Sequence, residues 1–521
     1  MVTIASQKPA ITGDARPGAN GKAIATQQSL DKTVYAICDI LRRSNCAGAM
    51  QYVPELSWLL FLRILDARET QEALEAAAVE GDFTPSLQAP YRWQDWAAPT
   101  GPTRRQLSHG SLNAFLTFVN TDLLLHLRGL SDLPNATPRQ KVIGQIMSGV
   151  ERTRVDTETN LLNVLDKVND IHPDVVDPTH LFTLSQVYEG LLLRMGEKGN
   201  DGGQFFTPRE VIRAMVQAIA PQRGETIYDP CCGTGGFLAQ SFEYLRDRLG
   251  PLAGPHDLDT LTRATFYGRE KDDAVYPIAL ANLVLHGIDE PHLWHGNTLT
   301  GAQTYGDLFL GAPPLFDVIL TNPPFGGKEG KEAQTNFDYK TGATQVLFLQ
   351  HMLKHLTPGG RCGIVLDEGV LFRTNETAFV QTKRKLLDEC DLWCIVSLPA
   401  GVFSGAGAGV KTNLLFFTKG TPTQSVWYFD LSDIKVGKKL PFILDRFTDF
   451  FRLLPDRGES DRSWTVTRAD LEARNYDLKA VNPHARVTED TRTPAELLDL
   501  IEAKGQEVAQ ALAELRGLTA R

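Results

Sequence analysis

Asn322, Pro323, Pro324 and Phe325 stand directly after the apolar run 316–321, and their types suit a site that holds a planar amine. The side-chain amide of Asn322 and the carbonyl of Pro323 can both accept hydrogen bonds from one NH2 group. The two prolines fix φ and stiffen the turn, while Phe325 offers an apolar face on which a base can stack. The pattern therefore predicts methylation of an amino group, although Asn-Pro-Pro is also an ordinary turn after a strand.

A glycine-rich loop lies upstream, between the short apolar run 226–228 and the helical pattern 237–245. Its glycines allow a tight turn and a close approach of the backbone to a ligand, which predicts a nucleotide-type pocket. The loop is a poor dinucleotide fingerprint, because Leu238 stands where a Gly or Ala is expected. An acid at the strand end suits a cationic sulfonium ligand better than a pyrophosphate. The candidate cofactor-binding residues of this loop are Asp229, Gly233, Thr234, Gly235, Gly236 and Phe237.

Two further strand-like segments end in polar residues. The segment 265–270 ends in Glu270, an acid of the type that binds both hydroxyls of a ribose. The segment 293–299 carries Asn297, whose amide could read an adenine edge. A single acid at a strand end is common, but four consecutive strand ends with fitting groups in order are hard to obtain by chance.

The segment 203–209 precedes another helical pattern and has two interpretations. Thr207 as N-cap, Pro208 at the first helical position and Glu210 at the third would form a capping box. A cap does not explain the two adjacent aromatic residues before it, which are costly to expose unless they close over a methionine moiety or a base. The candidate cofactor-binding residues of this segment are Gln204, Phe205, Phe206, Thr207, Pro208 and Arg209.

Taken in order, these motifs resemble the gamma-type arrangement of DNA adenine-N6 methyltransferases. The motifs are Gln-Phe-Phe-Thr-Pro, Asp-Pro-Cys-Cys-Gly-Thr-Gly-Gly-Phe, a glutamate, Gly-Asn-Thr-Leu and Asn-Pro-Pro-Phe. Within that family the chain is most similar to the modification (M) subunit of type I restriction-modification systems, over residues 29–485. The subclass depends on the N-terminal helices, on the chain length and on the lack of a long basic recognition segment after Phe325.

The resemblance implies a fold and a reaction. The fold is an α/β, seven-stranded, Rossmann-like methyltransferase sheet with an N-terminal all-α domain and a C-terminal helical tail. A methyl group would pass by SN2 transfer from S-adenosyl-L-methionine to N6 of an adenine flipped out of duplex DNA. Thr298 would join Asn297 at the cofactor. The implied partners are double-stranded DNA, a specificity (S) subunit, a second M subunit and a restriction (R) subunit, with no membrane.

Two other functions fit some of the same residues. N5-methylation of a protein glutamine acts on a similarly planar amide, but such enzymes are shorter and favour Tyr where this chain has Phe325. A non-catalytic scaffold that binds S-adenosylmethionine within a restriction complex is disfavoured by the intact Asn322 and Phe325.

Composition agrees with a DNA enzyme that needs partners. The chain has 521 residues, 42% of them hydrophobic, which is enough for several buried cores. Its formal net charge of −10 is unusual for a protein that grips DNA unaided, because sequence-independent DNA affinity depends on Lys and Arg. The local positive clusters are Lys328 with Lys331, 383–385 and 435–439, of which Lys328 is favoured by its position. Clusters of this size are also common on ordinary solvated surfaces.

The seven cysteines show no metal-ligand spacing, so we expect no metal site and reduced thiols in a cytoplasmic protein. No apolar run approaches the ~20 residues of a membrane span, and the N-terminus lacks an apolar signal core.

The sequence pattern divides the chain into four parts. Residues 1–28 are expected to be a flexible leader and 29–194 a helical domain, since apolar residues recur there at helical spacing. Residues 195–420 are expected to be the catalytic domain, entered through the glycine-rich joint 196–203. Residues 421–521 remain as a C-terminal region.

Strands and helices alternate in the catalytic part, which predicts a parallel sheet covered on both faces. The loop 404–409 is expected either to line the base pocket or to be a plain turn. The seven strand candidates are 226–228, 265–270, 293–299, 316–321, 361–366, 392–398 and 413–418.

The C-terminal region ends in a predicted partner-binding helix, 493–516. Thr493, Pro494 and Glu496 form a capping box at its start. One apolar stripe cannot bury itself, so it packs either on its own domain or on a partner helix. The resemblance implies the spacer helices of the specificity subunit as that partner. The stripe consists of Leu498, Ile501, Gly505, Val508, Leu512 and Leu515.

Overall fold

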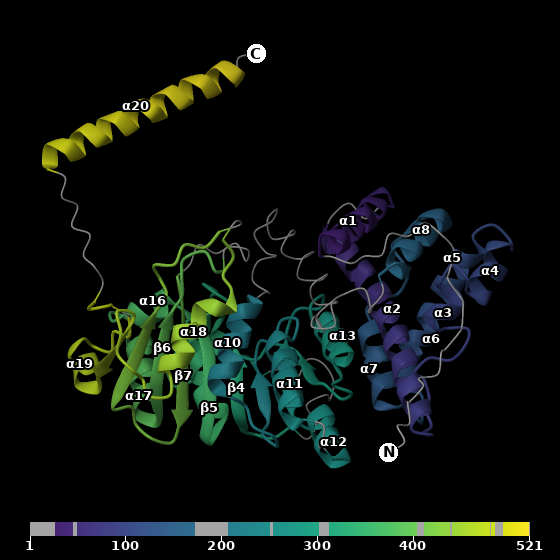
Figure 1. The fold of residues 1–521 in the computed structure, drawn as a ribbon, viewed down its shortest axis with the longest axis horizontal. Coiled ribbons are helices and arrows are strands. Elements are labelled where there is room, and N and C mark those ends of the chain that lie inside the picture. The colour runs from purple at the N-terminus through teal and green to yellow at the C-terminus, as the bar shows by residue number, and fades with distance from the viewer. Residues whose placement is uncertain are drawn as a thin grey trace, which may run out of the picture.

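The computed structural model describes residues 27–44, 49–171, 207–250, 254–301, 312–403, 411–437, 440–479, 481–484 and 493–519. Figure 1 shows a group of N-terminal helices, a sheet covered by helices and a separate C-terminal helix. The expected joint 196–203 and the loop 404–409 lie outside the described residues, as does the expected leader up to residue 26.

The N-terminal helices meet in an apolar core because each buries one face. Ile37 and Leu41 of α1 (Gln27–Arg43) and Trp58 of α2 (Ala49–Ala78) are almost completely buried. The first helix thus begins two residues before the predicted start of the helical domain. The shorter elements are α3 (Trp93–Trp96), α4 (Pro102–Ser108), α5 (Ala114–Phe118), the π-helical turn η1 (Val119–Leu123), α6 (Leu124–Gly129), the 3-10 turn η2 (Leu130–Asp132), α7 (Pro138–Met147) and α8 (Glu158–Asn169).

The catalytic sheet contains all seven predicted strands. Its strand order begins β3-β2-β1-β4-β5-β7-β6, and the first five of these strands run parallel to one another. The strands are β1 (Ile227–Asp229), β2 (Phe266–Glu270), β3 (His292–His295), β4 (Phe316–Thr321), β5 (Leu356–Asp367), β6 (Cys390–Ser397) and β7 (Thr412–Lys419).

Two predictions about this sheet are wrong. The sheet is mixed rather than parallel, because β7 pairs antiparallel with both β5 and β6. It also has nine strands rather than seven, since β8 (Ser425–Asp430) pairs with β6 and β9 (Ser463–Thr467) pairs with β8. The segment beyond residue 420 was expected to lie outside the sheet. Its apolar run, from Val426 to Phe429, is buried on both faces and therefore extends the sheet.

Helices cover both faces of the sheet, and alternate strand residues point to one or the other. Val318 and Leu320 of β4 face the first helical layer, whereas Ile319 faces the second. The first layer contains α10 (Arg209–Ile219), α11 (Gly236–Leu249), α13 (Tyr276–His286) and α18 (Thr448–Leu453). The second contains α15 (Thr344–His355), α16 (Glu368–Phe372), α17 (Thr377–Glu389) and α19 (Arg468–Ala473). The remaining elements are α12 (Pro255–Arg263), α14 (Lys331–Gln334) and the 3-10 turn η6 (Leu444–Phe447).

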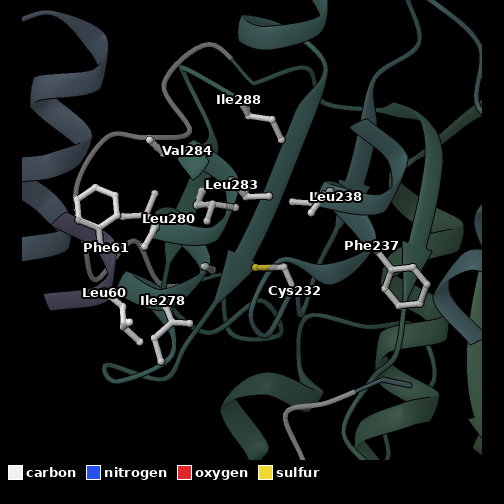
Figure 2. Packing of buried hydrophobic residues seen from close by; sticks show 14 of the residues in the cluster. Leu60, Phe61, Cys232, Phe237, Leu238, Ile278, Leu280, Leu283, Val284 and Ile288 are labelled. Atoms are coloured by element: carbon white, nitrogen blue, oxygen red, sulfur yellow. The ribbon is translucent and has the colours of Figure 1, made fainter. Parts of the chain in front are cut away.

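The N-terminal helices and the sheet share one continuous apolar core. Figure 2 shows Leu60 and Phe61 of α2 beside Ile278, Leu280 and Val284 of α13. Charged groups rim this junction: Arg139 of α7 pairs with Glu72 of α2 at 2.7 Å and with Asp289, which follows α13, at 2.9 Å. The N-terminal helices therefore hold α13 in place. This helix follows the acid at the end of β2.

The C-terminal helix α20 (Pro494–Thr519) stands apart from the rest of the molecule (Figure 1). Its predicted capping box is confirmed, since the backbone N–H of Thr493 donates to Glu496 and that of Glu496 donates to the Thr493 hydroxyl. Its apolar stripe faces solvent: Ile501 is 67% exposed and Val508 is 59% exposed. The described helices include none that is both long enough and apolar enough to cross a membrane.

Candidate active site

A cavity of about 440 Å³ opens at the carboxyl ends of β1 to β4. Because parallel strands end at the same edge of a sheet, the polar residues that follow them are brought together there. Asp229, Glu270, Asn297 and Asn322 all line this cavity, one from each successive strand end. The predicted convergence of four strand ends is therefore present in the fold.

The glycine-rich loop forms the turn between β1 and α11. Gly235 has a φ of 80°, in the left-handed region that favours glycine, and it immediately precedes the helix. A Cβ on Gly236 would lie 2.9 Å from the Ile212 side chain of α10, so close packing requires a glycine there as well. Gly233, Thr234, Gly236 and Phe237 line the cavity, while Gly235 shapes the turn from behind.

Two buried carboxyl groups lie at the floor of the cavity. Asp229 accepts hydrogen bonds from the Thr321 hydroxyl at 2.7 Å and from the Cys231 N–H at 3.2 Å. Glu270 accepts from the N–H groups of Gly233, Lys271 and Asp272, at 2.9, 2.8 and 2.9 Å. Burial raises the pKa of Asp229 and that of Glu270 to about 7, although these hydrogen bonds oppose the shift. Near neutral pH each group is therefore poised between its neutral and charged forms.

Asn297 and Thr298 form a tight turn after β3. The Asn297 side-chain oxygen accepts from the Leu299 N–H at 2.9 Å, and the Thr298 hydroxyl donates to the Pro230 carbonyl at 2.5 Å. One lone pair of the Asn297 side-chain oxygen is thus used by its own turn. Its NH2 group is the part of the side chain best suited to a hydrogen-bond acceptor on a ligand.

Asn322 is held by a residue from a distant part of the sequence. Its Nδ2 donates to the hydroxyl of Thr207 at 2.9 Å. Its Oδ1 is buried and has no hydrogen-bond partner among the described residues. Buried polar atoms are nearly always partnered, so this unpaired acceptor at a cavity wall indicates a site for a donor from a ligand.

The predicted capping box at α10 is wrong. The helix begins at Arg209, Pro208 is its N-cap, and no side chain caps it. The Thr207 hydroxyl instead accepts the hydrogen bond from Asn322, which a capping hydroxyl could not do as readily while bonded to the helix. Thr207 lines the cavity, whereas Pro208 and Arg209 do not. Gln204, Phe205 and Phe206 lie outside the described residues.

The rest of the Asn-Pro-Pro-Phe turn forms one wall of the cavity. Pro324 and Phe325 line it, and Phe403 lies edge-on to Phe325 with ring centroids 5.4 Å apart. Pro323 is buried behind this wall, and its carbonyl accepts a hydrogen bond from Gln345 Nε2 at 3.3 Å. No sequence motif pointed to Gln345 or Phe403, because both belong to apolar segments that read as ordinary core.

The predicted basic clusters differ in their surroundings. Lys328 is exposed and lines the cavity, as expected from its position. Lys383 is 1% exposed and donates to the carbonyls of Leu371 and Arg373, so it cannot contact a nucleic acid. Lys385 is paired with Asp338 at 2.6 Å. Within the described part of the chain, no group of His, Cys, Asp and Glu side chains is arranged to hold a metal ion.

The glycine turn after β1, the acid after β2 and the Asn-Pro-Pro-Phe turn after β4, on one edge of a mixed sheet, define a Rossmann-like methyltransferase. Comparison with known proteins identifies the family. Residues 180–492 match the model of the N-6 DNA methylase family, and residues 30–168 match that of the HsdM N-terminal domain. The chain belongs to the N-6 DNA methylase family and is a modification subunit of a type I restriction-modification system, with adenine-specific DNA methylation as its activity.

Individual relatives are similar along almost their whole length. The methylase subunit of the type I restriction enzyme EcoEI from Escherichia coli is 35% identical, with 94% of this chain and 97% of that protein covered. A crystal structure of a modification subunit of a type I restriction enzyme from Vibrio vulnificus YJ016 is 31% identical, with a TM-score of 0.76 and coverage of 90% and 99%. A chain from a study of complex assembly in a type I system is 36% identical, with a TM-score of 0.68 and coverage of 95% and 98%. These matches include the N-terminal helices, which argues against the glutamine-methylating alternative.

Proposed function

We propose that the cavity binds S-adenosyl-L-methionine against the glycine turn and presents its methyl group to N6 of an adenine that has been flipped out of duplex DNA. The observation that carries this assignment is the unpaired Oδ1 of Asn322 beside Phe325. It offers an acceptor for an amine next to a flat apolar surface for a base.

The cofactor would lie along the first three strand ends. Glu270 would accept a hydrogen bond from the ribose at the Oε2 lone pair that its backbone contacts leave open, and the close backbone of Gly233 to Gly236 would let the ligand approach the sheet. Asp229 would stabilise the cationic end of the cofactor. The NH2 group of Asn297, beside Thr298, would contact the cofactor's adenine. All of these residues except Gly235 line the same cavity.

The amine of the target base would be held by Asn322 and the Pro323 carbonyl. Two acceptors on one NH2 group draw its nitrogen from planar toward tetrahedral, which frees a lone pair otherwise conjugated with the ring. That lone pair forms the new N–C bond as the S–C bond of the sulfonium breaks, and the amine loses a proton after positive charge has formed on nitrogen. No strong base is needed, so the rate enhancement comes from positioning and electrostatics.

Sequence-specific DNA contact would come from partner subunits. The net charge of −10 is a poor basis for unaided DNA binding, because sequence-independent affinity depends on Lys and Arg contacts. A 36% identical chain comes from a study of type I complex assembly. We therefore propose that this chain assembles with a specificity subunit and a second modification subunit, and with a restriction subunit in the full complex.

Co-expression with the specificity subunit, followed by a labelled methyl donor and base-resolved sequencing of host DNA, tests this function. The expected result is label on adenine N6 within one recognition sequence. The chain alone is expected to bind DNA weakly and without sequence preference at physiological salt. Label on cytosine or on protein, or nanomolar sequence-specific binding by the single chain, would contradict the proposal.

Cofactor binding is expected to release protons near pH 7. Burial raises the pKa values of free Glu270 and Asp229 to about 7, so both carboxyls are partly protonated near that pH. Ribose hydroxyls and a sulfonium charge favour the ionised carboxylates and lower both pKa values on binding. Affinity should therefore rise as the pH increases from 6 to 8, a window centred on those pKa values.

Calorimetry at pH 7 in two buffers of different ionisation enthalpy measures this release. The apparent binding enthalpies should differ, and Glu270→Gln should reduce the difference while weakening binding by about tenfold or more. Equal enthalpies in both buffers, or an unchanged affinity in Glu270→Ala, would remove Glu270 from the ribose site.

A further inference from the structure

The two prolines of the Asn-Pro-Pro-Phe turn restrict its backbone but supply no hydrogen-bond donors. Pro323 and Pro324 have no N–H groups, so neither can donate a hydrogen bond within the turn. Pro324 confines the backbone of Pro323 to extended conformations, and a donor from outside the turn fixes the direction of the Pro323 carbonyl further.

Gln345, the second residue of α15, supplies that group. Its side chain is 3% exposed, its Nε2 donates to the Pro323 carbonyl at 3.3 Å, and its Oε1 accepts from the Asp367 N–H at 3.0 Å. A backbone N–H can only donate and a carbonyl can only accept, so these two contacts fix which way the amide faces. Gln345 itself does not line the cavity.

The Asp367 end of this bridge is anchored in the sheet. Asp367 is the last residue of β5, which pairs with β4 up to Thr321. Its carboxylate also caps α16 by accepting from the Val370 N–H at 2.9 Å. The Gln345 bridge therefore joins the turn after β4 to the rigid end of the neighbouring strand.

The first residue of α15 holds the other end of the turn. The Thr344 N–H donates to the Gly327 carbonyl at 3.3 Å. A Cβ on Gly327 would lie 2.4 Å from the Thr344 hydroxyl oxygen, so the Gly327 backbone packs closely against the Thr344 side chain. The first two residues of α15 thus hydrogen-bond to the turn at Pro323 and to the residue pair that follows it at Gly327.

We propose that Gln345 is a positioning residue for methyl transfer, which fixes the Pro323 carbonyl and with it the turn that presents Asn322 and Phe325 to the target amine. The proposal rests on the role proposed above for that carbonyl. A carbonyl oxygen has two lone pairs, so the bond from Gln345 leaves one for the substrate. Loss of the bond leaves the reacting nitrogen less well oriented, and small misplacements at a reacting centre are costly in rate.

The test compares Gln345→Leu with Gln350→Leu in the complex assembled with the specificity subunit. Gln350 is a matched control because it lies on the same helix, is also buried, and likewise bridges a backbone N–H and a carbonyl, both of Tyr339. We expect Gln345→Leu to lower kcat by about tenfold to a hundredfold, with cofactor affinity and KM for DNA nearly unchanged. Gln350→Leu should lower the melting temperature by a similar amount and keep its kcat.

Gln345→Glu adds a readout that a purely structural role would not move. An ionised glutamate cannot donate to the Pro323 carbonyl and repels it, whereas a protonated one can donate. The ratio of the variant's kcat to the wild-type kcat should therefore rise as the pH is lowered. A wild-type kcat in Gln345→Leu, or an equal loss in Gln350→Leu, would overturn the proposal. If Asn322→Ala is also fully active, the proposed function fails instead, so the two failures can be told apart.

Discussion

Replacing Asn322 by alanine is expected to abolish methyl transfer while leaving cofactor binding nearly unchanged. The variant loses the buried Oδ1 that awaits the target amine, and the hydrogen bond that it also loses goes to Thr207 rather than to Asp229 or Glu270. Removal of one well-placed polar contact to a transition state costs about 10²- to 10³-fold in rate, and the loss of the lone-pair alignment adds to it. Transfer of tritiated methyl to DNA measures the rate, and calorimetry measures the affinity for S-adenosylmethionine.

Asn120→Ala is a suitable control. Asn120 is also partly buried, donates to the Leu116 carbonyl at 3.1 Å and accepts from the Thr153 N–H at 2.8 Å, but it lies among the N-terminal helices. It should lose stability and keep its rate per folded molecule. A tenfold or greater loss of cofactor affinity in Asn322→Ala, ~1.4 kcal/mol, would move Asn322 out of the catalytic role.

The sheet was largely predictable because its strands are short apolar runs that end in unusual polar residues. The seven strand candidates all form strands. The direction of β7 was not predictable from these runs, since an apolar pattern carries no information on whether a neighbour runs parallel or antiparallel. The strand β8 was missed for a different reason: it lies beyond the last motif, and the expected domain boundary was set by the motifs rather than by the apolar run.

In the site, too, features set by neighbouring residues were predictable, whereas contacts between residues far apart in the chain were not. Each strand-end residue could be found from its own neighbours in the sequence, and the parallel strands β1, β2 and β4 then bring Asp229, Glu270 and Asn322 together. The hydrogen bond between Asn322 and Thr207 joins residues far apart in the chain, and local reasoning assigned the Thr207 hydroxyl to its own helix. Gln345 escaped notice for a similar reason, because a glutamine in an apolar helix is informative only once its partners are known.

The exposed apolar stripe of α20 bears on assembly rather than on catalysis. The sequence left open whether the stripe packs on its own domain or on a partner helix. In the structure it does not pack on its own domain, since Leu498, Ile501 and Val508 are 66%, 67% and 59% exposed. The side chain of Leu515 lies outside the described set. Exposed apolar rows on a long helix are unfavourable in water and favour a partner helix. We take the specificity subunit to be that partner, in keeping with the assembly proposed above.

Val508→Asp is therefore expected to prevent co-elution with the specificity subunit without altering the isolated chain. A charge buried unpaired in a helix interface costs about 3–5 kcal/mol, roughly a hundredfold or more in affinity. The same charge faces water in the free chain, so melting temperature and cofactor binding should not change. Gln506→Asp is the matched control, because it places the same charge on the same helix but away from the stripe. Size-exclusion chromatography of the co-expressed subunits measures assembly. A Val508→Asp variant that still assembles would show that the stripe is not the interface. A lower melting temperature of its isolated chain would show that the stripe packs on its own domain.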